Sequence, residues 1–316
     1  MGPKMLCSFA SILAVFLAVH QPFTVHPRSL RSTAPSLTSF QGLEESLKGQ
    51  NKQGVTEVKR HLKALGYLDY EDENRVVVLD DDEFDETLES ALRSYQRFYR
   101  LKVTGKLDVD TVKQMSVPRC GVPDFVPPRH ANRNATEPNK FHVVSRYRFA
   151  AGMAKWPPSK FHLTYAFGSI PKAMSLGELR GVFWRAFQTW AHVTAFTFNE
   201  VSTGESPDFV IGFYSGDHGD GQPFDGPGGF LAHSSEPTPG FPAYGKSHYD
   251  ADEPWSLNPS STQMDLESVA LHEIGHILGL AHSEDPKAVM YYGIAAGAVK
   301  RVLQQDDIDG IHTLYS

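Results

Sequence analysis

The sequence predicts an α+β protein in which a small helical module precedes a domain of mixed helices and strands. Two segments, residues 55–65 and 88–99, carry apolar side chains at three- and four-residue spacing, the period of a helix with one buried face. Residues 161–167 alternate apolar and polar side chains, as a half-buried strand does. Longer helical patterns follow at 175–190 and 265–280, so strands and helices share the second half.

The N-terminus has the pattern of a secretory signal. Lys4 precedes an apolar run from Leu6 to Val19, which is too short to span a bilayer and lies where the apolar region of a signal peptide lies. We therefore expect residues 1–25 to be a signal peptide and the protein to be secreted into the extracellular matrix or apoplast. The chain ends without the hydrophobic tail of a lipid-anchor signal, so no transmembrane or lipid anchor is expected.

Charge and cysteine content narrow the class of partner. Residues 147–316 carry ten lysines and arginines against nineteen acidic residues. An acidic domain argues against a nucleic-acid partner, and its carboxylates either form a solvated surface or bind cations.

Cys7 falls in the expected signal peptide, which leaves Cys120 alone. A lone cysteine in a secreted chain indicates an intermolecular bridge or a reactive thiol.

The other elements have local signals. Gly66 ends the first helix, and Asp108 can cap a third short helix that runs to Met115. The proline-containing stretch 123–139 is a linker with a glycosylation sequon at Asn134. Ser175 and Glu178 form a capping box before the 175–190 helix. We expect strands at 196–201 and 208–214, a long loop over 215–262 with no periodicity, and a closing helix near 306–315.

The helix at 265–280 carries a metal-binding pattern. His272 and His276 lie four residues apart and therefore share one helix face, where both imidazoles can bind one ion. Glu273 lies beside that ion and can take a proton from water. Gly279 can turn the chain so that His282 becomes a third ligand. Three protein ligands leave one position for water, which is the arrangement of a catalytic zinc site.

The sequence around this pattern resembles the matrixin branch of the metzincin proteases. Met290, eight residues after His282, resembles their Met-turn, and Ser283 is typical of matrixins. Residues 118–124, Pro-Arg-Cys-Gly-Val-Pro-Asp, resemble the cysteine switch of matrix metalloproteinases, and residues 50–115 resemble their peptidoglycan-binding-like prodomain. Since no hemopexin-like repeat follows, the layout resembles that of minimal matrixins, including the plant enzymes.

The resemblance implies three segments: a signal peptide at 1–25, a propeptide at 26–146 and a catalytic domain at 147–316. The catalytic domain would have the metzincin fold, a twisted mixed sheet with an active-site helix and a C-terminal helix. In the latent form Cys120 would occupy the fourth zinc position, until an activating protease or autocleavage cuts the chain near Tyr147. Asp306 and Asp307 would then hold the new N-terminus and the Met-turn, or they are simply acids favoured at a helix N-terminus.

Further metal sites and a substrate strand are also implied by the resemblance. Two zinc ions and at least one calcium ion are expected as cofactors. The structural zinc would be bound by His218, Asp220, His233 and His248, and the calcium by Asp225, Gly226, Gly228, Phe230, Asp250 and Glu253. Asp208 and Gly240 match part of a second calcium site, although the stretch between His233 and His248 is two residues longer than in the common animal pattern.

Leu231 and Ala232 lie in the segment that resembles the edge strand to which an extended peptide substrate adds. Tyr292 replaces the proline that usually follows Met-Tyr.

These patterns predict a secreted, zinc-dependent endopeptidase that is made as a zymogen and cleaves extracellular or matrix proteins such as collagen. Zinc would activate a water molecule, with Glu273 as general base. Two alternatives stay open. A non-catalytic wall- or glycan-binding protein would use the peptidoglycan-binding-like module, although the presence of Glu273 and all three histidines weighs against it. A zinc hydrolase could also act on a non-peptide substrate.

Overall fold

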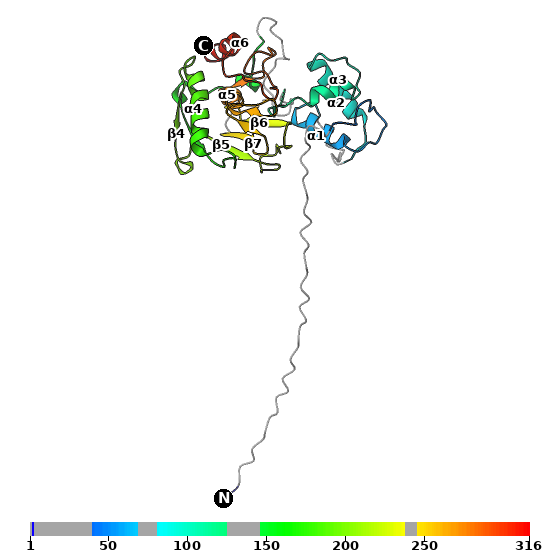
Figure 1. Ribbon diagram of the computed structural model, residues 1–316, viewed down its shortest axis with the longest axis horizontal. Coiled ribbons are helices and arrows are strands. Elements are labelled where there is room, and N and C mark those ends of the chain that lie inside the picture. The colour runs from blue at the N-terminus through cyan, green and yellow to red at the C-terminus, as the bar shows by residue number, and fades with distance from the viewer. Residues whose placement is uncertain (1, 3–39, 69–80, 125–145, 238–244) are drawn as a thin grey trace. The chain divides into compact units, whose positions relative to one another are not determined.

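The computed structural model of the 316-residue chain describes residues 2, 40–68, 81–124, 146–237 and 245–316 (Figure 1). The expected signal peptide at 1–25, the Asn134 sequon and Gly240 lie outside these residues. Within the described ranges, none of the helices has the length and apolar character needed to cross a membrane. The α+β class is confirmed, since the chain has six α-helices in these ranges and a mixed sheet.

The N-terminal module contains three helices: the two that the apolar spacing predicts and the short third one that Asp108 is expected to cap. They are α1 (Val55–Ala64), α2 (Glu86–Phe98) and α3 (Val109–Met115). The carboxylates of Asp85 and Asp108 accept the backbone N–H of Leu88 and Thr111, which caps the start of α2 and α3. The core of the module consists of buried apolar side chains from all three helices, among them Val58, Leu62, Leu88, Leu92, Tyr95 and Val112.

The second half of the chain is built on a six-stranded sheet in the order β1-β6-β7-β5-β3-β4. These strands are β1 (Arg119–Cys120), β3 (His162–Phe167), β4 (Thr197–Glu200), β5 (Phe209–Tyr214), β6 (Phe230–Ser234) and β7 (Lys246–Asp250). Neighbours run parallel except β6 and β7, which are antiparallel. Two small sheets pair β2 (Arg148–Phe149) with β10 (Leu280–Ala281), and β8 (Trp255–Ser256) with β9 (Met264–Asp265).

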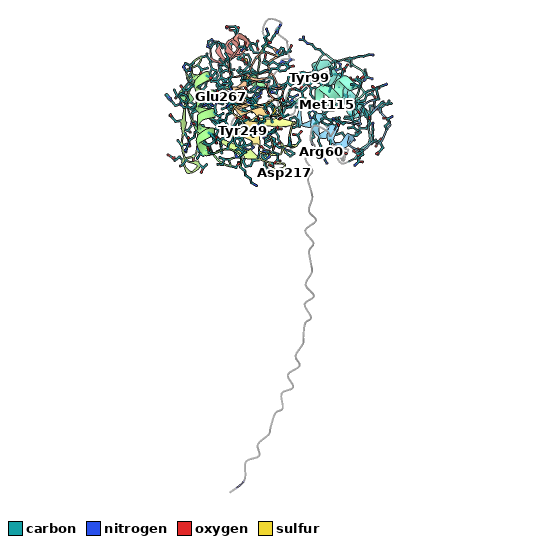
Figure 2. All side chains as sticks on the ribbon, viewed as in Figure 1. Arg60, Tyr99, Met115, Asp217, Tyr249 and Glu267 are labelled. Atoms are coloured by element: carbon teal, nitrogen blue, oxygen red, sulfur yellow. The ribbon has the colours of Figure 1, made fainter. Side chains whose placement is uncertain are left out.

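Three long helices complete this half: α4 (Leu176–Ala191), α5 (Leu266–Ile277) and α6 (Gln305–Tyr315). Single 3-10 turns occur at η1 (Ala151–Met153), η2 (Pro158–Lys160) and η3 (Thr203–Glu205). The Trp190 indole on α4 donates to the Leu271 carbonyl of α5 at 2.8 Å, which locks the two helices together. Tyr249 of β7 is fully buried in the same core (Figure 2). The core therefore holds α5, the helix of the metal pattern, rigidly over the sheet.

Periodicity alone was wrong over residues 215–262. The structure places β6, β7 and β8 in this stretch instead of one long loop. All five residues of β6 and four of the five residues of β7 are buried, so neither strand shows the alternation of a half-buried strand. The resemblance to an edge strand at 229–233 located β6 where periodicity did not.

Candidate active site

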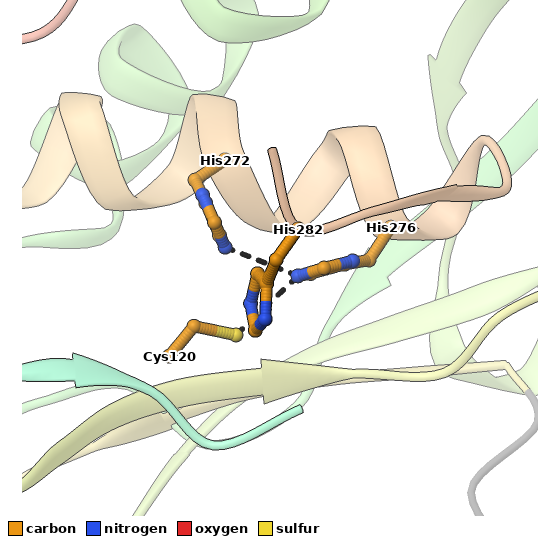
Figure 3. A group of neighbouring side chains, drawn as sticks. All are labelled: Cys120, His272, His276 and His282. Atoms are coloured by element: carbon orange, nitrogen blue, oxygen red, sulfur yellow. Dashed lines mark hydrogen bonds between the residues drawn. The ribbon is translucent and has the colours of Figure 1, made fainter. Parts of the chain in front are cut away.

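Local structure brings three histidines to one point. Helix α5 begins where the Asp265 carboxylate accepts the Ser268 N–H at 3.0 Å, and it places His272 and His276 one turn apart on the same face. The helix ends before Gly279, which has φ +99°, and a Cβ at this position would lie 2.4 Å from the Ala154 carbonyl oxygen. Only glycine fits this turn, which returns the chain so that His282 faces the other two (Figure 3).

The ring nitrogens that meet are lone-pair donors rather than N–H groups. His272 Nδ1 donates to the Val289 carbonyl at 2.7 Å, and His276 Nδ1 donates to the Leu280 carbonyl at 2.8 Å, since a carbonyl can only accept. Their Nε2 atoms then face each other without protons, 3.0 Å apart. Burial lowers the pKa of His272 to about 3 and that of His276 well below its ordinary value, so neither ring is charged.

Cys120 and His282 complete the cluster. The Cys120 sulfur lies 3.4 Å from His276 Nε2, and the ligand atoms of all four residues lie within 4.8 Å of one another. His282 Nε2 is buried without a hydrogen-bond partner among the described residues. Converging lone pairs from three imidazoles and a thiol require a cation between them. Three nitrogens and one sulfur form a four-ligand donor set of the kind that zinc prefers, and the backbone carbonyls on Nδ1 orient two of the rings.

Glu273 is positioned beside this cluster as a base. Its side chain is fully buried, and in the part of the chain that the structure describes neither oxygen has a partner of hydrogen-bond geometry, although Cys120 and Ser234 lie close enough to favour its charged form. Burial raises its pKa to about 7. Glu273 lines one cavity together with Cys120 and His272, so its carboxylate can reach a water molecule that replaces the cysteine sulfur.

Met290 and Asp307 hold the histidine-bearing helix and the turn after it in position. A Cβ on Gly275 would lie 2.2 Å from the Met290 sulfur, so the glycine allows methionine to pack directly under α5. The Asp307 carboxylate accepts the N–H groups of Val289 and Met290 at 2.9 and 3.0 Å. Asp307 is 1% exposed and is therefore not a surface acid. Its bonds fix the turn at Val289, and the Val289 carbonyl in turn orients His272.

The segment around Cys120 occupies the edge of β6. Strand β1 pairs with β6 in parallel, with Cys120 opposite Ala232. The Gly121 N–H donates to the Ala232 carbonyl at 2.8 Å, and the Cys120 N–H donates to the Tyr292 carbonyl at 2.9 Å. The edge strand that contains Leu231 and Ala232 is therefore already paired, and no peptide can add there while Cys120 stays in place.

A buried polar network holds this segment, and sequence reasoning missed most of it. Asp124 lies at its centre, where its carboxylate accepts from Arg119 Nη2 and from the hydroxyls of Tyr67 and Tyr99, each at 2.7 Å. Although burial alone would raise the pKa of Asp124, Arg119 holds it well below its usual range. Arg119 and Asp124 belong to the switch heptapeptide, but nothing in the apolar spacing of α1 and α2 distinguishes the two tyrosines.

A second cluster contains His218, Asp220, His233 and His248, whose ligand atoms also lie within 4.8 Å of one another. Asp220 Oδ2 is 2.8 Å from His248 Nδ1, 2.9 Å from His233 Nε2 and 3.0 Å from His218 Nε2. Burial would raise the pKa of Asp220, but hydrogen bonds with the histidines keep it well below its usual value. Three nitrogens and one carboxylate form a closed four-ligand set, which fits a structural zinc.

Three further carboxylates gather beside a glycine-rich loop. Their partners are backbone N–H groups: Gly226 donates to Asp250 at 3.1 Å, Gly228 to Glu253 at 2.6 Å and Phe230 to Asp225 at 2.7 Å. Burial raises the pKa of Asp225 to about 7, of Asp250 to about 6 and of Glu253 to about 8. Glu253 Oε2 is buried without a partner among the described residues. Three carboxylates that form no ion pair with a lysine or arginine among the described residues make a donor set that fits calcium.

Asp208, expected at a second calcium site, has other partners. Its Oδ1 lies 2.5 Å from the Lys160 ammonium, and its Oδ2 accepts the backbone N–H and the hydroxyl of Thr164 at 2.9 Å each. A protein cation thus already faces this carboxylate.

Comparison with known proteins gives two family matches. Residues 155–316 match the model of the matrixin family, and residues 51–115 match that of a putative peptidoglycan binding domain. The chain is 42% identical over 273 residues to "Metalloendoproteinase 1" of Glycine max, a match that covers 84% of this chain and 83% of the relative. It is 39% identical to "Metalloendoproteinase 2-MMP" of Arabidopsis thaliana, over 92% of this chain and 79% of the relative. "Matrix metalloproteinase-16" of Homo sapiens is 42% identical over 73% of this chain and 37% of that protein.

Proposed function

The chain belongs to the matrixin family of zinc metalloendopeptidases, and on that premise we propose that it is a secreted zymogen that cleaves extracellular proteins after losing its propeptide. One observation carries the proposal: the Cys120 thiol completes the ligand set of His272, His276 and His282 in the cavity that contains Glu273. A donor set with three histidines and a removable fourth ligand suits an enzyme that is latent until that ligand leaves.

In the active form, the three histidines hold the metal and Glu273 moves the proton. When bound, zinc supplies a Lewis acid that polarises the scissile carbonyl and acidifies water. Glu273 takes a proton from the attacking water and later delivers it to the leaving amine. The β6 edge at Leu231 and Ala232 would bind the substrate backbone by strand addition once β1 has left.

Activation requires a cut before the catalytic domain. The Arg146 N–H donates to the Asp306 carboxylate at 3.1 Å, and β2 is paired with β10. Arg146 would leave with the propeptide, but β2 lies C-terminal to a cut near Tyr147, so such a cut would keep the β2–β10 pairing and release Cys120. The cut would be made by another protease or by autocleavage.

Zymography separates this proposal from its two alternatives. Casein or gelatin cleavage that a chelator abolishes would support a metalloendopeptidase. A zinc hydrolase of non-peptide substrates would leave both proteins intact, as would a glycan-binding protein.

Removing the Asp124 network should make the proform leak activity. Asp124→Ala leaves Arg119 buried without its counter-charge, and breaking a buried ion pair costs about 3–5 kcal/mol. We expect the intact variant to cleave a fluorogenic peptide at least about 100-fold faster than the latent wild type, since each 1.4 kcal/mol is tenfold in an equilibrium constant. Asp110→Asn, an exposed acid on α3, serves as the control. A tightly latent Asp124→Ala proform would argue against the network.

Calcium should stabilise the fold through the three carboxylates. An ion present at 100 times its dissociation constant adds about 2.7 kcal/mol to the free energy of unfolding, which corresponds to about 5–10 °C in melting temperature for a domain of this size. Asp250→Asn should lose most of this gain. Asp252→Asn, an exposed neighbour, should keep it. A wild-type melting temperature that is independent of calcium would contradict the site.

A further inference from the structure

A cavity opens directly beside Glu273 and His272, and its walls differ in chemistry. Most of its lining is apolar or aromatic, including Leu231, Val269, Val289, Ile294 and Tyr291. Lys300 also lines it, as the one lysine or arginine among the lining residues. Because the cavity shares the base and a metal-binding histidine, a substrate side chain that enters it belongs to a residue next to the scissile bond.

The Lys300 side chain is held in place by the protein. Its ammonium donates to the carbonyls of Pro286 and Ala288 at 2.9 and 3.2 Å and lies 4.9 Å from the centre of the Tyr291 ring. A lysine has three N–H donors, so these two carbonyls leave one for a ligand. Burial lowers the pKa of Lys300, although the carboxylates of Asp307 and Asp285 act in the opposite direction, and neither of them is within ion-pair distance of its ammonium.

The loop that carries Lys300 is fixed to the start of α5. The Lys300 backbone N–H donates to the Ser268 hydroxyl at 2.6 Å, and the neighbouring Arg301 forms an ion pair with Asp265, the residue that caps α5. Both anchors lie at the start of the helix that carries Glu273 and His272. The lysine is therefore fixed relative to the catalytic residues rather than free to swing into solvent.

We propose that Lys300 is a specificity-determining residue that selects substrates with an acceptor-ended side chain, glutamate or glutamine, at the residue that enters this cavity. The inference rests on the proposed peptidase function. The apolar walls suit the methylene stem of either side chain, and the remaining N–H of Lys300 suits its terminal oxygen. In a partly buried site the same ammonium repels a lysine or arginine side chain, because little water screens the two charges.

Cleavage of matched peptides by enzyme that has been activated from the full-length chain tests the role of Lys300. Two peptide sets vary the residue before or after the scissile bond as Leu, Gln, Glu or Lys, and the rate ratio Glu/Leu is measured for wild type, Lys300→Met and Lys300→Arg. A hydrogen bond to a charged group changes the rate ratio by about tenfold or more. At one of the two positions, Lys300→Met should lower the Glu/Leu rate ratio by about tenfold or more. Lys300→Arg should retain the wild-type preference.

Lys287→Met is the matched control, because Lys287 is an exposed lysine between the two carbonyls that Lys300 binds, and it does not line the cavity. Casein hydrolysis by the same preparations distinguishes a wrong role for Lys300 from a wrong assignment of the peptidase function. If wild type cleaves casein but Lys300→Met keeps the wild-type Glu/Leu ratio at both positions, the role of Lys300 is wrong and the peptidase function stands. If wild type cleaves neither casein nor any peptide, the proposed function falls, and this inference with it.

Discussion

Replacing Glu273 with glutamine is expected to abolish peptide hydrolysis while zinc stays bound. The amide has nearly the shape of the carboxylate but cannot take a proton from water, and general acid–base catalysis contributes about 10²–10⁴-fold to a rate. His272, His276 and His282 are unchanged in this variant, and two of their rings are oriented by backbone carbonyls. Metal affinity should therefore survive the loss of activity.

The measurement is the cleavage rate of a peptide by processed enzyme, together with the zinc content of the same sample. Glu267→Gln is a suitable control, since Glu267 lies on the same helix and pairs with Arg185 away from the histidines. It should retain most of the activity. An active Glu273→Gln variant with full zinc content would sink the assignment of Glu273 as the base.

Replacing Cys120 with serine should yield a proform that is active without being cut. Zinc binds the thiolate strongly, whereas a serine hydroxyl stays protonated near neutral pH and competes poorly with water. We expect activity to rise well above background but to stay below that of the processed enzyme, because β1 still covers the β6 edge. The Arg119–Asp124 network is unchanged in this variant, so the substrate must displace β1 from β6, and small peptides should benefit most.

Intact mass must be recorded alongside activity, because an active proform can cut itself. The double variant Cys120→Ser with Glu273→Gln should be inactive and remain at full length. A Cys120→Ser chain that is intact, folded and fully latent would contradict the role of the thiol.

Features set by local sequence were predictable, and features set by contacts between distant residues were not. The histidine spacing on α5 and the glycine turn at Gly279 follow from helix geometry alone, so the sequence was sufficient to group His272, His276 and His282. The apolar periods likewise predicted α1, α2 and α4. Strands β6 and β7 escaped periodicity because both are almost wholly buried.

The side-chain partners of distant residues depend on the tertiary fold. The spacing of α1 and α2 does not indicate that Tyr67 and Tyr99 donate to Asp124, and the loop sequence does not indicate that Lys300 lines the cavity beside Glu273. Lys160 opposite Asp208 is a third example, because the contact joins the last residue of η2 to the residue before β5, which are 48 positions apart in the sequence.

X-ray absorption at the zinc edge of the intact proform tests the central claim, that Cys120 binds the catalytic zinc, most directly. The spectrum averages over the two zinc sites of each chain, and only the catalytic one has a thiolate ligand. The latent form should therefore show about half a sulfur neighbour per zinc at ~2.3 Å, with nitrogen and oxygen neighbours at about 2.0–2.2 Å. The processed enzyme and Cys120→Ser should show no sulfur neighbour. A latent proform with full zinc content and no zinc–sulfur distance would contradict the account.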